Sequence, residues 1–158
     1  MEEICKKIVE TLKTKKCTIS FMESCTGGFL ANSITNISGA SDILKVSLVT
    51  YSTEYKEHFG VDKNIIKQYT VYSMETAKEM SRNVSNLAKS NIGVGVTGEL
   101  GNTTKDENRV YYSIYFSNIN KYITKEIVIE SNKREKMKGT VADNIFKDIM
   151  EELNGQYE

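Results

Sequence analysis

A glycine pair just before a helical pattern is the feature that most constrains the fold of this sequence. Residues 18–22 (Thr-Ile-Ser-Phe-Met) are rich in β-forming side chains and partly alternating, which predicts a strand. Apolar residues then recur at positions 30, 34 and 37, which predicts a helix that Ser-Gly at 38–39 ends. Residues 23–28 (Glu-Ser-Cys-Thr-Gly-Gly) therefore form a strand-to-helix turn.

This turn has the composition of a binding loop. Gly27 and Gly28 let the backbone come close to a ligand, and the start of the helix offers free N–H groups to an anion. Ser24 and Cys25, just before the glycines, are candidate nucleophiles. The alternative is an ordinary turn in which Thr26 caps the helix and nothing binds.

The remaining patterns alternate between helix and strand, ending in a hairpin. In a chain of 158 residues they predict a single α/β domain over residues 1–158. We expect a three-layer α/β/α fold, in which a mixed, mostly parallel sheet ends in a β-hairpin and lies between two layers of helices. Ligands bind at the carboxyl ends of the strands in such sheets. Three polar loops are expected there, at residues 24–28, 51–56 and 97–101. The expected helices cover residues 2–15, 63–69, a segment from 73 and one from about 133; the other strands cover 45–50, 92–96, 110–117 and 122–129.

Charge and composition exclude several classes of function. The 21 basic and 21 acidic residues give no net charge, so we expect no nucleic-acid partner. No apolar run is long enough to span a membrane and the first residues do not resemble a signal peptide, so we expect no membrane partner and a cytoplasmic location. Three cysteines without a CxxC pair, and the single histidine His58, argue against a metal site.

The order of several short motifs resembles that of the CinA C-terminal domain (competence/damage-inducible) family. Besides residues 23–28, the matching segments are 39–41 (Gly-Ala-Ser), 49–52 (Val-Thr-Tyr-Ser) with Lys56, 60–61 (Gly-Val) and 96–98 (Val-Thr-Gly). The resemblance covers nearly the whole chain and implies the stand-alone form of the domain, which longer CinA proteins carry together with a further N-terminal domain. It implies hydrolysis of the carboxamide of nicotinamide mononucleotide, a small-molecule substrate, to nicotinic acid mononucleotide and ammonia, without metal or other cofactor. We also expect a homo-oligomer, a dimer or higher.

The resemblance assigns the catalytic residues. Ser24 and Ser41 match the family's active-site serines and Lys56 its lysine, which acts as a base only when burial or a nearby positive charge lowers its pKa. Tyr51 would position the serine or donate to the oxyanion. Each residue has a plainer interpretation: Ser41 as a helix N-cap, Lys56 as a surface lysine, and Tyr51 as a half-buried aromatic at a strand end.

The substrate-binding residues follow in the same way. The turn residues Thr26, Gly27 and Gly28, together with Thr97 and Gly98, would bind ribose or phosphate, and Arg134 would clamp the phosphate. The plainer interpretation of Arg134 is an ordinary residue at a helix start. If the strands near 18–22, 45–50 and 92–97 are parallel neighbours, Ser41 starts at the opposite edge from Ser24 unless a loop or a neighbouring subunit delivers it.

Part of the expected substrate cradle differs from the family pattern. The loop at 98–104 (Gly-Glu-Leu-Gly-Asn-Thr-Thr) has no proline and few glycines, Tyr111 stands in place of a glycine, and Asn132-Lys133 replaces Gly-Asp. The reactive groups persist across three loops, which favours an amidohydrolase, either with the family's substrate or with an altered choice of substrate. The alternative is a catalytically silent nucleotide-binding or protein-interaction module of the same fold.

Overall fold

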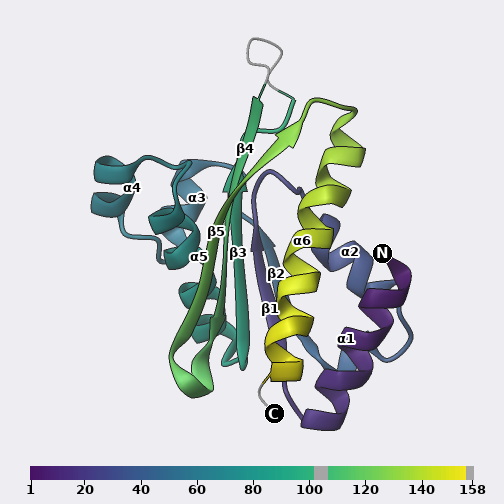
Figure 1. Cartoon of the computed structure of the whole chain (residues 1–158). Helices are drawn as coiled ribbons and strands as arrows, with labels where there is room; N and C mark the ends of the chain where they lie inside the picture. The colour runs from purple at the N-terminus through teal and green to yellow at the C-terminus, as the bar shows by residue number, and fades with distance from the viewer. Residues whose placement is uncertain (102–106, 156–158) are drawn as a thin grey trace.

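The computed structural model describes residues 1–101 and 107–155, which form a sheet between two layers of helices (Figure 1). Helices α1, α2 and α6 cover one face of the sheet, and α5 with the short α3 and α4 covers the other. The helices are α1 (Glu2–Lys15), α2 (Phe29–Thr35), α3 (Thr53–His58), α4 (Lys63–Tyr69), α5 (Met74–Ala88) and α6 (Arg134–Gly155); the strands are β1 (Ile19–Glu23), β2 (Leu44–Val49), β3 (Ile92–Gly98), β4 (Glu107–Phe116) and β5 (Lys121–Glu130), with 3-10 turns η1 (Ala40–Asp42) and η2 (Ser117–Ile119).

The strand order β2-β1-β3-β4-β5 confirms the mixed sheet that ends in a hairpin. Strand β1 pairs in parallel with both β2 and β3, while β3 with β4 and β4 with β5 are antiparallel. The carboxyl ends of β1, β2 and β3 therefore lie at one edge of the sheet, as the sequence predicted. No helix within the described residues is long and apolar enough to cross a bilayer.

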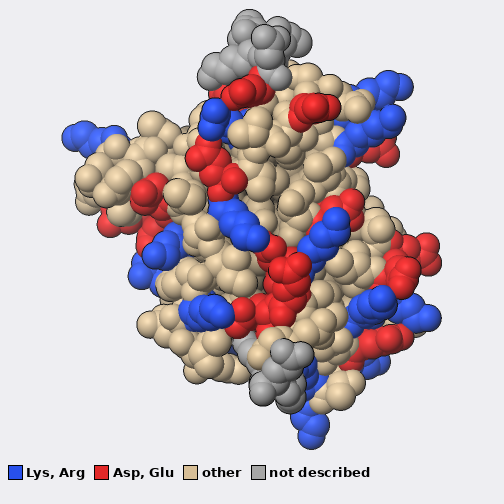
Figure 2. All heavy atoms as spheres, in the orientation of Figure 1, with Lys and Arg blue, Asp and Glu red and all other residues tan. Residues whose placement is uncertain are grey.

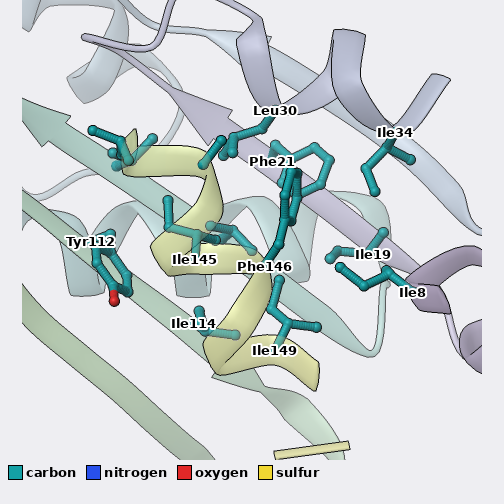
Figure 3. Packing of buried hydrophobic residues seen from close by; sticks show 14 of the residues in the cluster. Ile8, Ile19, Phe21, Leu30, Ile34, Tyr112, Ile114, Ile145, Phe146 and Ile149 are labelled. Carbon is teal, nitrogen blue, oxygen red and sulfur yellow. The ribbon is translucent and has the colours of Figure 1, made fainter. Parts of the chain in front are cut away.

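The main core lies between the sheet and helices α1, α2 and α6. Every residue of β1 is buried, because the strand is central in the sheet and covered on both faces. Figure 3 shows Phe21 of β1, Leu30 of α2 and Phe146 of α6 meeting in this core, and all three are fully buried. Helix α6, at the end of the chain, is thus held against elements from its beginning.

On the opposite face, α5 packs directly on the backbone of β3. A Cβ atom at Gly93 would lie 2.0 Å from the carbonyl oxygen of Ser81, and one at Gly95 would lie 2.4 Å from that of Ala77. Real Cβ atoms do not approach so closely, so the helix can take this position only over glycine. The glycine face predicted from the alternation at residues 92–96 is confirmed.

We expect Gly95→Ala to destabilise the protein because the new methyl group must push α5 away from β3. Overpacking of this kind decreases the free energy of unfolding by about 1–3 kcal/mol. Thermal and urea unfolding measure the change, with Gly155→Ala as the control, since a Cβ at Gly155 has no atom within 4 Å. Equal stability of the two variants would contradict the close packing of α5 on β3.

Candidate active site

A cleft with a volume of about 390 Å³ opens at the carboxyl edge of the parallel strands. Volumes of about 300–1,000 Å³ are typical of small-molecule sites. Five residues predicted from the sequence line the cleft, and they come from four separate parts of the chain: Ser24, Tyr51, Lys56, Gly98 and Arg134. The structure therefore brings together most of the predicted catalytic groups.

Lys56 and Ser24 form a buried pair in this cleft. The side chain of Lys56 is only 1% exposed, and its Nζ donates hydrogen bonds to Ser24 Oγ at 3.0 Å and to the carbonyl oxygen of Thr50 at 2.7 Å. Burial lowers the pKa of Lys56, because the charged ammonium loses its hydration. The interpretation of Lys56 as a surface lysine is wrong.

A short helix that the sequence analysis missed turns Lys56 inward. Helix α3 begins after Ser52, whose Oγ accepts a hydrogen bond from the backbone N–H of Tyr55 at 3.3 Å. Within this helix Lys56 is buried, while Glu54 and Glu57 remain exposed. The capping serine was the local signal that would have revealed the helix.

The carboxylate of Glu23, fully buried at the end of β1, organises the turn that carries Ser24. Its Oε1 accepts hydrogen bonds from Thr26 Oγ1 at 2.8 Å and the backbone N–H of Leu30 at 2.9 Å. Its Oε2 accepts from the backbone N–H of Ala31 at 3.1 Å and from Ser47 Oγ at 3.3 Å. The anion seat expected at this helix start is therefore occupied by the protein's own carboxylate.

The turn residues themselves differ in part from the sequence prediction. The N-cap of α2 is Gly28 and not Thr26, whose hydroxyl instead donates to Glu23. Gly27 and Gly28 have φ values of 58° and 95°, in the left-handed region that favours glycine. The two glycines thus allow the tight turn, and Gly27 also leaves space for a neighbouring side chain, since a Cβ there would lie 3.1 Å from Lys138 Nζ.

Thr26, Gly27 and Gly28 are not among the residues that line the cleft, and two further predicted residues also lie away from its wall. Thr97 is fully buried, and its Oγ1 donates to the carbonyl oxygen of Val71 at 3.0 Å, so it holds the segment that lines the cleft. Ser41 is exposed in η1, before β2 begins, and lines a separate depression with Thr35 and Gly39. Because β2 is six residues long, with a rise of about 3.3 Å per residue, Ser41 lies at the opposite edge of the sheet from Ser24.

Ser41 is also not the N-cap of its turn. That position belongs to Gly39, and no side chain caps η1. Within one chain the structure therefore brings Ser24, but not Ser41, next to Lys56.

Several lining residues were missed by sequence reasoning. Helix α6 contributes Lys138, one turn after Arg134, and the i, i+4 spacing from Arg134 was the available signal. Val71 and Tyr72 were also missed, and no motif marks them. The remaining lining residues lie within the three loops that the sequence placed at this edge: Cys25, Thr53, Glu99 and Leu100. Burial, followed by the nearby charge of Glu99, raises the pKa of Tyr72, so its phenol stays protonated near neutral pH.

The described departures from the family pattern lie partly in the cleft wall and partly away from it. Tyr111 pairs with Thr97 across β3 and β4 and is not among the residues that line the cleft. Of the rewritten loop, Gly98, Glu99 and Leu100 line the cleft, while residues 102–104 lie outside the described part of the chain. Within the described residues, no group of three histidine, cysteine or acidic side chains is placed to hold a metal ion.

We expect Glu23→Gln to lower the stability of the protein, because an amide NH₂ cannot accept the hydrogen bonds that one carboxylate oxygen accepts. A buried group left unsatisfied costs about 1–3 kcal/mol, which thermal and urea unfolding detect. Glu10→Gln, at an exposed position of α1, is the matched control. If both variants unfold alike, Glu23 does not hold the turn together.

Proteins of known structure share the fold of this chain. The competence/damage inducible protein CihA from Agrobacterium tumefaciens superposes with a TM-score of 0.87 at 24% identity, covering 97% of this chain and 94% of that one. A CinA superfamily protein from Klebsiella pneumoniae has the same TM-score at 20% identity, covering 98% of both chains. At these identities the likeness shows the fold.

Sequence comparisons reach closer relatives. A Thermoanaerobacter pseudethanolicus protein, named as competence-damage inducible, is 36% identical over 136 residues, which is 84% of this chain and 32% of that protein. A CinA-like protein from Flavobacterium psychrophilum is 37% identical over 107 residues, 67% of this chain and 26% of that protein. The chain thus spans about a quarter to a third of the length of these relatives. The pattern of the CinA C-terminal domain matches residues 1–153, and the chain belongs to the CinA C-terminal domain family.

Proposed function

We propose that this protein hydrolyses the carboxamide of nicotinamide mononucleotide, releasing ammonia and nicotinic acid mononucleotide. The observation that carries the proposal is the 3.0 Å hydrogen bond between Lys56 Nζ and Ser24 Oγ, in a cleft of small-molecule size. A serine is a weak nucleophile unless a nearby base takes its proton. A buried lysine with a lowered pKa is a suitable base.

The contacts of Lys56 suit this role. A neutral amine has two N–H groups and one lone pair, and the carbonyl oxygen of Thr50 accepts one of the N–H groups at 2.7 Å. The lone pair is then free to face Ser24 Oγ. The bond to Thr50 would hold Lys56 in place while it exchanges a proton with the serine.

In the proposed reaction Ser24 Oγ attacks the carboxamide carbon while its proton passes to Lys56. The tetrahedral intermediate collapses as the C–N bond breaks, and Lys56 returns the proton to the departing nitrogen, giving ammonia and an ester on Ser24. A water molecule then attacks the ester carbon while its proton passes to Lys56. As the acyl–Oγ bond breaks, Lys56 returns this proton to Ser24 Oγ, which releases nicotinic acid mononucleotide and regenerates the serine. The backbone N–H of Cys25 and the hydroxyl of Tyr51, two residues that line the cleft, are candidate donors to the oxyanion.

Family membership supports the reaction class, and the position of Tyr111 supports it further, because this substitution does not fill the cleft. We propose Ser24 as the attacking residue. Ser41 would act only if a second subunit of a homo-oligomer delivered it, because it lies at the other edge of the sheet.

One observation favours the alternative of a catalytically silent module. Glu99 lines the cleft, and its carboxylate opposes an anionic ligand if it faces inward. Incubation of the purified chain with nicotinamide mononucleotide separates the two functions, because only the amidohydrolase releases ammonia.

We expect ammonia release whose rate rises with pH through the lowered pKa of Lys56. Below this pKa Lys56 is protonated and cannot act as a base, whereas above it the neutral amine is available. Because burial places the pKa below the ordinary value of 10.5, the rising limb should lie at lower pH than for an exposed lysine. The measurement is kcat/KM for ammonia release across a pH series.

The matched variants are Lys56→Met and Lys63→Met. Methionine fills a similar volume without a base, so Lys56→Met should decrease kcat by about 10²–10⁴-fold while keeping its thermal unfolding transition. Lys63 is exposed on α4 and its replacement should leave the rate unchanged. An active Lys56→Met protein would exclude the Ser–Lys mechanism, and a wild-type protein that releases no ammonia would favour the silent module.

Cys25 should not be the nucleophile, although it neighbours Ser24. Burial raises the pKa of the Cys25 thiol to about 12, so the reactive thiolate is scarce at neutral pH. We therefore expect Cys25→Ser to retain substantial activity and Ser24→Ala to lose it, in the same ammonia assay. Complete loss of activity in Cys25→Ser, with a normal unfolding transition, would reverse the assignment.

A further inference from the structure

Among the described residues that line the cleft, Glu99 is the only acidic one. The other charged residues of the lining are basic: Lys56, Arg134 and Lys138. Glu99 follows Gly98, the last residue of β3, and belongs to the loop whose sequence departs from the family pattern. This carboxylate is therefore a feature of the cleft that the family resemblance does not explain.

The sheet places Glu99 at the same edge as Ser24. Strands β1 and β3 are parallel neighbours in which Met22 pairs with Gly95, and neighbouring strands are about 4.8 Å apart. Ser24 directly follows β1, and Glu99 directly follows β3. The backbone N–H of Glu99 donates to the carbonyl oxygen of Arg109 at 3.1 Å, which ties this position to β4. The carboxylate thus comes from the strand exit beside that of the proposed nucleophile.

Tyr72 lines the cleft close to Glu99. The hydrogen bond from Thr97 Oγ1 to the carbonyl oxygen of Val71, at 3.0 Å, holds the segment of Tyr72 against the end of β3. After burial, the charge of Glu99 is the next cause of the raised pKa of Tyr72, which indicates that the two side chains interact. Tyr72 is 46% exposed, so part of its ring can contact a ligand. The face of such a ring carries partial negative charge.

Basic and acidic side chains are intermixed on the face of the molecule shown in Figure 2 and form no field of one sign. The whole chain carries no net charge either. The attraction or repulsion of a ligand is therefore decided by the groups that it meets in the cleft. A carboxylate and an aromatic face both attract a flat cation, so the part of the wall formed by Glu99 and Tyr72 suits a positively charged ring.

We propose that Glu99, with Tyr72 beside it, selects aromatic amides whose ring carries a positive charge. This inference rests on the proposed function, because the ring of nicotinamide mononucleotide is a pyridinium cation that bears the carboxamide. With the carboxamide at Ser24, the attached ring lies at the same edge of the sheet as Glu99. A neutral amide of the same shape lacks the attraction and binds less tightly. Glu99 is thus a residue for specificity, and Ser24 and Lys56 keep the chemistry.

The test varies the charge of the ligand and the charge of residue 99 independently. The ligands are nicotinamide mononucleotide and benzamide mononucleotide, which keeps the carboxamide, ribose and phosphate but has carbon in place of the charged ring nitrogen. Isothermal titration calorimetry gives both dissociation constants in a Ser24→Ala background, so that neither ligand is consumed. The readout is the dissociation constant of the neutral ligand divided by that of the cationic one, because effects on their shared groups cancel in this ratio.

The variants added to this background are Glu99→Gln, the charge-conserving Glu99→Asp, and Glu54→Gln as the matched control. Glu54 is exposed on α3 and is not among the residues that line the cleft. The pair Tyr72→Leu and Tyr72→Phe tests the ring, since phenylalanine keeps the aromatic face and leucine does not. Thermal unfolding shows whether each variant is folded, and Glu99→Ala replaces Glu99→Gln if the latter is not.

We expect Glu99→Gln to decrease the ratio by about three- to tenfold, as for the loss of a partly exposed charge pair. Glu99→Asp should keep most of the preference for the cationic ring, and Glu54→Gln should match the parent protein. Tyr72→Leu should also decrease the ratio, whereas Tyr72→Phe should retain it. An unchanged ratio in Tyr72→Leu would remove the tyrosine from the proposal.

The outcomes separate this inference from the proposed function. A preference for the cationic ring that depends on Glu99, in a protein that releases no ammonia, would reject the amidohydrolase and keep the cation site. Ammonia release together with an unchanged ratio in Glu99→Gln would reject the cation site and keep the amidohydrolase. A parent protein that binds both ligands equally, or binds neither, would also overturn the inference.

Discussion

The buried carboxylate of Glu23 is the interaction on which the site depends. A carboxylate without water must be satisfied by hydrogen-bond donors, and here they come from the first turn of α2, from Thr26 and from Ser47 of β2. One side chain therefore joins β1, β2 and α2 at a single point. Ser24 is the next residue along the chain, so its position follows from a structural constraint that has no part in the chemistry.

The pairing of Ser24 with Lys56 shows how the fold changes the chemistry of an ordinary side chain. An exposed lysine is protonated at neutral pH and cannot take a proton from a serine. Burial of Lys56 removes the amine from water, and the only compensation within the described residues is a carbonyl oxygen and a hydroxyl. Neither acceptor carries a full charge, so burial dominates and favours the neutral amine.

Helix α6 completes the cleft from the other end of the chain. Its apolar face is held in the main core, where Phe146 meets Phe21 and Leu30 (Figure 3). This packing fixes the start of the helix, and with it Arg134 and Lys138, relative to the turn that carries Ser24. The two ends of a substrate would thus be recognised by parts of the chain more than a hundred positions apart, joined through one hydrophobic core.

Local patterns in the sequence determined the helices other than α3, the strands, the final hairpin and the glycine face of β3, because periodicity and turn residues act over a few neighbouring positions. With the rule for parallel sheets they also placed the loops of Ser24 and Lys56 at one edge, and the motif order identified the family. Only the tertiary structure decided that Lys56 is buried, that Glu23 occupies the expected anion seat, that Ser41 lies apart from Ser24 and that Lys138 joins Arg134. Each of these depends on contacts between distant segments, and the pKa of an amine or the partner of a carboxylate is set by such contacts and not by the neighbours in the chain.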